Sequence, residues 1–261
     1  MIESLNSPHV GRVKALTGSK GSRERRATGA FVAEGLQCFR EAINSNQGPR
    51  ISTLYLTASA RVKLNEFTDL SLIDIFDVSD DVMRAMSETI TPQGILAICT
   101  IPSISLDSIK LNGTRKFIYL SEVQDPGNAG TILRSADAFG MDAVITSPGS
   151  VDMYSPKVVR STAGSLWHIP VFESIELQDL LSLKALQVIT LGSGGSKPLS
   201  SFISTGDCVA IFGNEARGLA SEQLLRDIES VHIPMPGSAE SLNLSAAASI
   251  LMYHLANMHV L

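Results

Sequence analysis

The strongest constraint on the fold is a regular alternation of apolar runs and helical segments that begins at residue 117. Apolar runs lie at 117–123, 143–146, 186–192 and 207–213, and the chain closes with a helical segment at 244–258 that is rich in small residues. Runs that stay apolar at successive positions indicate strands buried on both faces, which is typical of parallel sheets with helices above and below. The alternation by itself predicts an α/β domain with a doubly wound sheet.

The first hundred residues carry a looser mixture of patterns. Helical spacing predicts a helix over 31–45, with Phe31 at the start of its apolar stripe. Further strands, with one short helix at 80–89 between them, are expected at 52–57, 72–78 and 94–101. We therefore expect a second, smaller α/β domain in this part of the chain.

The boundary between these two parts is expected in a polar stretch. Residues 102–116 combine a proline, several serines and an Asn-Gly pair, which is the composition of a linker. The prediction is a domain over 1–101, a linker over 102–116 and a domain over 117–261. The hydrophobic content of 44% is ample for a sizeable core, so disorder is not expected.

The net charge of −5 conceals an asymmetry along the chain. Residues 1–50 contain eight Lys or Arg against four Asp or Glu, whereas the remaining residues contain thirteen against twenty-two. The basic residues of this end stand among glycines and serines, and they are Arg12, Lys14, Lys20, Arg23, Arg25 and Arg26. Such a cluster attracts a phosphate backbone, so Arg23, Arg25 and Arg26 are candidate RNA contacts. The alternative is a solvated N-terminal arm.

Cysteine usage and hydropathy limit the cellular setting. Cys38, Cys99 and Cys208 are far apart and lie in apolar runs, which favours buried, reduced thiols in a cytoplasmic protein over a disulfide framework or a zinc site. Residues 1–18 contain no apolar signal core, and no later run approaches the ~20 residues that span a bilayer. The sequence therefore predicts neither a metal site nor a membrane role.

Three stretches carry the candidate chemistry: QDPGNAGTILRSADAFG at 124–140, IFGNEARGL at 211–219 and IPMPGSAESLNLSAAASI at 233–250. Each places glycines and polar residues where a strand gives way to a helix, and ligands of α/β domains bind at such junctions. The polar residues that they supply are Asn128, Arg134, Glu215, Ser241 and Asn243. Because this set has no histidine, cysteine or carboxylate pair, it suits positioning rather than metal or nucleophilic chemistry.

Each of these residues also has a purely structural interpretation. Asn128 stands where a helix needs an N-cap, and Ser241 or Asn243 could cap the closing helix in the same way. Arg134 lies off the apolar stripe of its helix and could be a solvated surface arginine. Glu215 could stabilise the next helix through its charge. Taken one at a time, these interpretations are adequate.

Taken together, the three motifs resemble those of the SpoU (also called TrmH) family of RNA ribose 2′-O-methyltransferases. The resemblance covers nearly all of 117–255, in the family's order and at appropriate spacing. It implies a SPOUT-like α/β domain threaded into a trefoil knot, which the residue pattern could not reveal because knots are rare. It also implies a homodimer that methylates structured RNA, ribosomal RNA being favoured over transfer RNA. The N-terminal part resembles, more loosely, the family's small substrate-binding domain.

The resemblance also assigns roles to individual residues. The implied catalytic residues are Asn128, Arg134, Glu215, Ser241 and Asn243. The implied binding residues for S-adenosylmethionine are Gly213, Asn214, Ile233 and Leu242, largely through their backbone. No metal is implied.

The role of Arg134 stays open at this point. The family resemblance assigns activation of the ribose hydroxyl to this arginine, yet a guanidinium with a pKa above ~12 is a poor base at neutral pH. Either Arg134 takes the proton in a desolvated site, or it stays charged, stabilises the alkoxide and orients a phosphate. A non-catalytic RNA-binding module of the same fold is a further alternative. A nicotinamide-dependent oxidoreductase is disfavoured, because the GxGxxG fingerprint and its acidic partner are missing.

Overall fold

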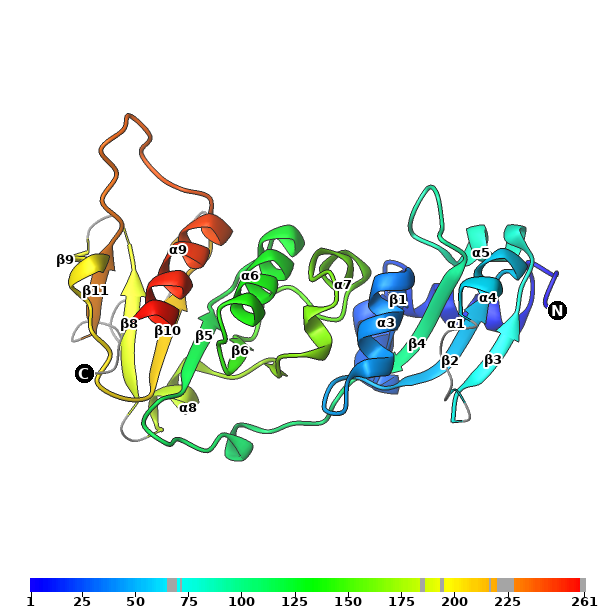
Figure 1. The fold of residues 1–261 in the computed structure, drawn as a ribbon, viewed down its shortest axis with the longest axis horizontal. Coiled ribbons are helices and arrows are strands. Elements are labelled where there is room, and N and C mark those ends of the chain that lie inside the picture. Colours follow the sequence, from blue (N-terminus) through cyan, green and yellow to red (C-terminus); the bar gives the residue numbers. More distant parts are fainter. Residues whose placement is uncertain are drawn as a thin grey trace. The chain divides into compact units, whose positions relative to one another are not determined.

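The chain folds into two compact units, shown in Figure 1. The structure is a computed structural model that describes residues 1–64, 70, 72–183, 186–192, 195–215, 217–219 and 228–258. Unit 1 comprises Met1–Ser103 and Tyr154–His168, and unit 2 comprises Ile104–Met153 and Ile169–Leu261. The domain boundaries expected from the sequence stay a prediction, and they did not single out Tyr154–His168 as a segment that packs with the N-terminal residues.

Unit 1 contains a four-stranded sheet in the order β1-β4-β2-β3. Strands β1 and β2 run antiparallel to β4, whereas β3 runs parallel to β2. Its elements are α1 (Pro8–Thr17), α2 (Gly21–Thr28), β1 (Ala30–Glu34), α3 (Leu36–Asn44), β2 (Ile51–Leu56), α4 (Ala58–Lys63), β3 (Asp74–Asp77), α5 (Asp80–Met86), β4 (Ile95–Thr100) and α7 (Pro156–Ser161), with a 3-10 turn at Ser165–Trp167. The basic N-terminal end is therefore helical.

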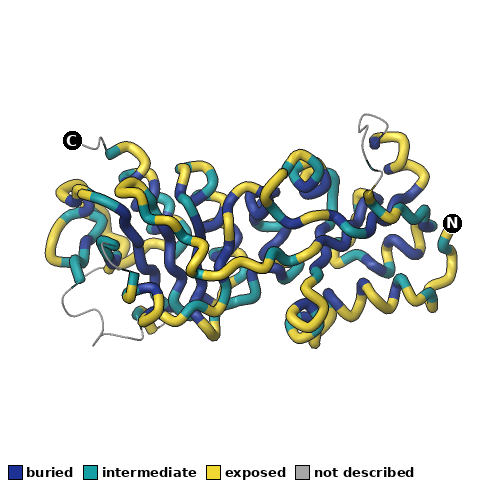
Figure 2. Tube along the Cα trace, turned by 90° about the horizontal axis from the view of Figure 1, so that it is seen from below, coloured by how far each residue is buried: buried dark blue, intermediate teal, exposed yellow. Residues whose placement is uncertain are grey.

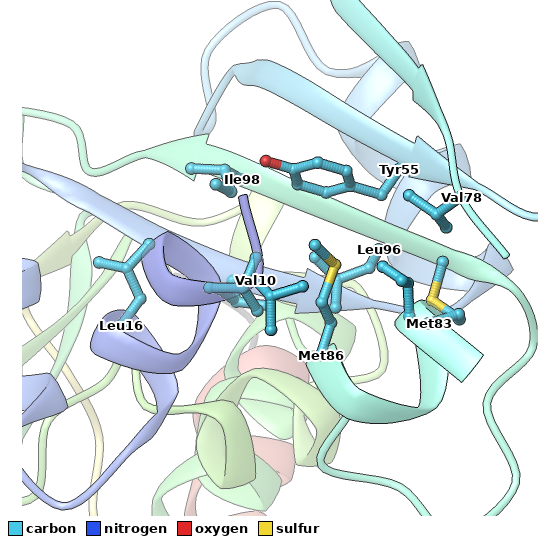
Figure 3. Close-up of a cluster of buried hydrophobic side chains, with 11 residues drawn as sticks. Val10, Leu16, Tyr55, Val78, Met83, Met86, Leu96 and Ile98 are labelled. Atoms are coloured by element: carbon cyan, nitrogen blue, oxygen red, sulfur yellow. The ribbon is translucent and has the colours of Figure 1, made fainter. Parts of the chain in front are cut away.

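Helices α1 and α5 cover one face of this sheet (Figure 3). Val10 and Leu16 of α1 and Met83 of α5 are buried against Leu96 and Ile98 of β4. Val10, Val13 and Leu16 recur at helical spacing and give α1 a narrow apolar stripe. Burial of this stripe stabilises the ordered, basic N-terminal end.

The helix expected over 31–45 begins later than the spacing suggested. Residues Ala30–Glu34 form β1, and only Leu36–Asn44 are helical. Gly35 separates the two with a φ of +100°, a backbone conformation that favours glycine. Phe31, Val32 and Ala33 are all buried, which fits a strand covered on both faces. The prediction that Phe31 belongs to the apolar stripe of a helix is therefore wrong, because Phe31 lies in β1.

The segment Tyr154–His168 completes the core of unit 1. Trp167 donates from Nε1 to the carbonyl of Pro49 at 2.9 Å, and its own carbonyl accepts from Ser45 Oγ at 2.7 Å. The ring of Phe31 lies 5.1 Å from that of Tyr154 and 6.1 Å from that of Trp167. Without this segment, unit 1 would expose a large aromatic surface.

Unit 2 contains a sheet in the order β7-β6-β5-β10-β8-β11-β9, in which all described pairs are parallel. The parallel α/β sheet predicted from the sequence is confirmed. Its elements are β5 (Lys116–Leu120), α6 (Pro126–Ala138), β6 (Ala143–Thr146), β7 (Val171–Phe172), α8 (Leu177–Leu181), β8 (Gln187–Leu191), β9 (Lys197–Pro198), β10 (Cys208–Phe212), β11 (Glu229–His232) and α9 (Leu244–Asn257), with 3-10 turns at Leu106–Ser108 and Leu199–Ser201.

The trefoil knot that the family resemblance implies for unit 2 stays a prediction.

The sheet of unit 2 has a covered core on both faces, and its strands are mostly buried (Figure 2). On one face, Phe117, Tyr119 and Ile211 pack with Leu180 of α8. Helices α6 and α9 lie side by side elsewhere in the unit (Figure 1), joined by a 2.8 Å hydrogen bond between the hydroxyls of Ser135 and Ser249.

All three cysteines are free and buried, as the sequence predicted. Burial raises the pKa of the Cys38 thiol to about 11, so this thiol is protonated and unreactive at neutral pH. Among the described residues, no helix combines the length and the apolar character that crossing a bilayer requires.

Candidate active site

The candidate active site lies where three neighbouring strands of unit 2 end. Strands β6, β5 and β10 are adjacent and parallel, so the loops at 147–153, 121–125 and 213–219 leave the same edge of the sheet. Hydrogen bonds join the loops to one another. Glu122 N–H donates to Ser147 Oγ, and Asn214 Nδ2 donates to the Glu122 carbonyl, both at 2.8 Å. Ligands of parallel sheets bind at this carboxyl edge.

Helix α6 starts at the site with a different cap from the one expected. Asp125 is the N-cap, and its carboxylate accepts from the main-chain N–H of Asn128 at 2.7 Å. Pro126 follows at the first helical position, where its missing N–H costs nothing. The expectation that Asn128 caps the helix is therefore wrong. Its side chain, relieved of capping, is available for other contacts.

Glu215 binds the start of α6. Its carboxylate accepts from Asn128 Nδ2 at 3.1 Å and from the main-chain N–H groups of Gln124 and Asp125, both at 3.4 Å. Burial by itself would raise the pKa of Glu215, but hydrogen bonds from its own main-chain N–H, from Asn128 and from the two loop amides outweigh it and lower the pKa. Glu215 is therefore charged at neutral pH and is a poor base.

Asn243 connects the third motif to the first. Its Oδ1 accepts from the main-chain N–H groups of Ser245 at 2.9 Å and Ala246 at 3.3 Å, so the structural expectation of an N-cap for α9 is confirmed. Its Nδ2 donates to Asn128 Oδ1 at 3.0 Å. Glu215, Asn128 and Asn243 thus form one row of hydrogen bonds, which we call the carboxylate–amide chain. It ties together all three motifs.

Arg134 and Ser241 do not join this chain. Both side chains are exposed. Within the described part of the protein, neither has a hydrogen-bond or ion-pair partner. Arg134 lies on α6, six residues beyond Asn128, and its guanidinium is free to meet a ligand. Ser241 lies at the end of the loop that leads to Asn243.

The second motif is a tight loop that only glycine permits. A Cβ at Gly213 would lie 2.4 Å from the carbonyl carbon of Gly218, which is far below van der Waals contact. Asn214 and Gly218 exchange main-chain hydrogen bonds of 2.8 Å, and the Asn214 side chain is nearly buried. Gly213 and Asn214 therefore shape this loop from inside.

The third motif offers unpaired main-chain groups. Between β11 and α9 the chain makes a long loop (Figure 1), and none of residues 235–242 has a described hydrogen-bond partner. Leu242 is 40% exposed, and Ile233 is partly buried. Free amides and carbonyls beside apolar side chains suit an adenosine moiety, whose base has polar edges and an apolar face. The residues expected to bind the cofactor fit such a group.

The three candidate RNA contacts of unit 1 differ from one another. Arg23 and Arg26 are exposed on α2. Arg25 is only 5% exposed, and its guanidinium donates to the carbonyl of Leu16, which ends the apolar stripe of α1. Arg25 therefore holds α2 against α1, and its position differs from that expected of a surface contact. Nothing in the sequence indicated that Arg25 is buried, because the three arginines lie close together in one basic run.

Comparison with known proteins agrees with this geometry. Residues 115–253 match the SpoU rRNA Methylase family. The chain belongs to this family. Residues 8–97 match the MRM3-like substrate binding domain, which accounts for most of the N-terminal part. The family resemblance stated from the three motifs is therefore confirmed.

Individual members of the SpoU family are similar over almost the whole chain. A Bacillus subtilis 23S rRNA (guanosine(2553)-2′-O)-methyltransferase is 35% identical, covering 97% of this chain and 98% of its own. A Streptomyces viridochromogenes 23S rRNA (uridine(2479)-2′-O)-methyltransferase is 27% identical, covering 92% of this chain and 86% of its own. The crystal structure of an AdoMet-bound rRNA methyltransferase from Sinorhizobium meliloti has a TM-score of 0.85 at 29% identity, covering 97% of this chain and 96% of its own.

The SpoU site also uses residues that the sequence analysis did not select. Asp125 was available as a signal, because an Asp before a Pro at a helix start is a common cap. Glu122 and Ser147 carried no such signal, since their roles depend on loops that are distant in sequence. In the described residues, no group of three or more His, Cys, Asp or Glu is placed to hold a metal ion.

Proposed function

We propose that the protein transfers a methyl group from S-adenosylmethionine to a ribose 2′-hydroxyl of ribosomal RNA. The observation that carries this proposal is the carboxylate–amide chain at the carboxyl edge of the sheet. In it, Asn128 of the first motif is hydrogen-bonded to Glu215 of the second and to Asn243 of the third. Membership of the SpoU family and the printed activities of its relatives support it.

The proposed reaction is an in-line displacement that depends on positioning. S-adenosylmethionine supplies an activated methyl group on a sulfonium. The protein must hold the ribose oxygen in line with that group, and such positioning can provide much of the rate enhancement. The carboxylate–amide chain supports this by joining the α6 start, the 213–219 loop and the α9 start. Because its hydrogen-bonding groups are already paired, we assign it to positioning rather than to proton transfer.

Arg134 is the group that we assign to the reacting oxygen. The Arg134 side chain is exposed to solvent, and a guanidinium is a poor base, which supports the electrostatic role over that of a base. A charged guanidinium stabilises a developing alkoxide and can orient the adjacent phosphate by paired hydrogen bonds. Proton removal then falls to solvent or to the RNA itself.

The test of the proposed function is a map of ribose methylation in cells. Ribosomal and transfer RNA from a strain with the gene and a strain without it are compared at every ribose, for resistance of the 3′ bond to alkaline cleavage. We expect a methylated ribose in 23S RNA to be lost without the gene and restored by a plasmid copy. Loss of a transfer RNA methyl would support the alternative substrate, and unchanged maps would contradict the proposed activity.

The substrate RNA is proposed to be held in part by an exposed basic face of unit 1. Lys20, Arg23 and Arg26 line a shallow hollow of about 530 Å³ together with Ser19 and Ser22. Cationic side chains interleaved with hydroxyls match the oxygens of a phosphate backbone. Arg25 is not part of this face, because it is buried.

Neutralising this face should weaken RNA binding and its salt dependence. Each phosphate contact contributes about 0.9 to the slope of log affinity against log salt for a duplex, and about 0.7 for a single strand. Arg23→Ala with Arg26→Ala should therefore reduce the slope by roughly 1.4–1.8. Filter binding or fluorescence anisotropy at several salt concentrations measures this. Arg84→Ala removes an exposed arginine of α5 and serves as the matched control. An unchanged slope in the double variant would show that Arg23 and Arg26 do not contact the phosphates of the RNA.

Two further expectations belong to the proposed function. We infer that the protein is a homodimer, as the family resemblance implies. An apolar groove of about 500 Å³ supports this, since it runs along α9 and exposes Ile203, Ile250 and Tyr253. We also infer a cytoplasmic location, in keeping with three free thiols and an RNA substrate.

A further inference from the structure

A non-glycine residue adopts a left-handed backbone at the centre of the site. Glu122 follows β5 with a φ of +53°, in a region that favours glycine and that other residues enter only when their surroundings hold them there. This turn redirects the chain from β5 so that Gln124 and Asp125 present their main-chain N–H groups to Glu215. The position of α6 and of Asn128 therefore depends on the turn at Glu122.

Two side chains hold the turn from opposite sides. Ser147 Oγ accepts from the N–H of Glu122 at 2.8 Å, and Asn214 Nδ2 donates to the carbonyl of Glu122 at 2.8 Å. These bonds fix the peptide groups before and after the left-handed residue. Ser147 is only 8% exposed, so its hydroxyl acts away from competing water. Asn214 belongs to the second motif, whereas Ser147 lies in no motif described above.

We propose that Ser147 is a positioning residue for methyl transfer, acting through the left-handed turn at Glu122. It rests on the methyl transfer proposed above and adds the loop after β6 to the three motifs. The Ser147 hydroxyl contacts no reacting atom. Its effect is to keep the start of α6, and with it Asn128, in register with Glu215.

The substitution that tests this removes the hydroxyl. Ser147→Ala should lower kcat by roughly 5- to 10-fold, as expected for the loss of one buried hydrogen bond that orders the site. Ser147→Thr keeps the oxygen and should retain most of the activity. Ser204→Ala is the matched control, because Ser204 is also a serine of unit 2 that is not fully exposed, but its hydroxyl donates to the carbonyl of Gly206 in the loop before β10 rather than to the turn. It should stay close to wild type.

A glycine at position 122 separates positioning from general stability. Glycine adopts a positive φ without help, so Glu122→Gly should make the hydroxyl of Ser147 dispensable. Because Glu122→Gly also removes the ion pair between Glu122 and Arg217, Glu122→Gly alone is the reference for the double variant. We expect the double variant Glu122→Gly with Ser147→Ala to stay within about 3-fold of that reference. A role of Ser147 in loop stability alone would not be relieved by this second change. Thermal melts of every variant accompany the kinetics.

The outcomes decide between the two proposals. Wild-type kcat in Ser147→Ala, or a loss from Ser147→Ala that is as large in the Glu122→Gly background as in the wild type, would overturn the positioning role while leaving methyl transfer intact. Absence of methyl transfer in the wild-type protein would instead refute the proposed function. If Ser147→Ala does not fold, Ser147→Cys provides the same comparison, since a thiol is close in size and a much weaker acceptor.

Discussion

Arg134→Ala is expected to reduce methyl transfer by about 10²–10³-fold while leaving the fold and the affinity for S-adenosylmethionine nearly unchanged. This magnitude is typical of the loss of one group that stabilises developing charge in a transition state. Because the Arg134 side chain is exposed and has no partner among the described residues, its removal costs little stability. Single-turnover kinetics, calorimetry with S-adenosylmethionine and thermal melts measure the three quantities separately.

Two further variants make the Arg134 experiment specific. Arg134→Lys should recover little activity, because an ammonium cannot reproduce the planar fork of the guanidinium. Arg84→Ala, the exposed arginine of α5 already used above, should leave kcat unchanged. An Arg134→Ala enzyme with near wild-type kcat would return Arg134 to the solvated surface role that its helix position also allows.

The second large effect is expected at the centre of the carboxylate–amide chain. Asn128→Ala removes both hydrogen bonds that link Glu215 to Asn243, and we expect kcat/KM to fall by roughly 10- to 100-fold. Asn128→Asp should be worse although it is isosteric, because it places a second carboxylate against that of Glu215. Asn46→Asp, an exposed asparagine of unit 1, controls for the added charge. Equal activity of the two Asn128 variants would contradict a charged Glu215.

The pH dependence of these variants follows from the charge of Glu215. In the wild-type protein the pKa of Glu215 is lowered, so the stabilisation that it provides is present above the usual carboxyl pKa and is lost as pH falls through the lowered value. The hydrogen bonds of the carboxylate–amide chain in the wild-type protein should therefore persist in mildly acidic buffer. In Asn128→Asp the repulsion raises the pKa of the pair, so its deficit should shrink as pH falls from 8 to about 5.5. Stopped assays across this range measure both effects.

The sheet of unit 2 was predictable because burial on both faces leaves a direct mark in the sequence. Strands such as Cys208–Phe212 are apolar at every position, and no helix with a solvated face has this pattern. The β1 strand was missed because Ala30–Glu34 precedes an amphipathic helix and shares its apolar spacing. In that region only the glycine at 35, with its positive φ, marked the boundary.

The sequence predicted which residues belong to the candidate site, but it did not predict the contacts between them. Asn128, Glu215 and Asn243 were selected from the motifs, but their mutual hydrogen bonds join positions that are 87 and 115 residues apart. No local pattern encodes such pairings. Ser147 and the left-handed turn at Glu122 were missed for the same reason. The burial of Arg25 was hidden because a basic side chain rarely leaves water, and does so here to bond a helix carbonyl.

Following the methyl group itself tests methyl transfer to the ribose most sharply. Purified protein is incubated with 23S RNA and S-adenosylmethionine that carries a deuterated methyl group, and the RNA is digested to nucleosides for mass spectrometry. We predict one labelled nucleoside whose fragmentation places the deuterated methyl on the ribose, with the label lost in Arg134→Ala. A label on the base, or a ribose label that persists undiminished in Arg134→Ala, would contradict this prediction.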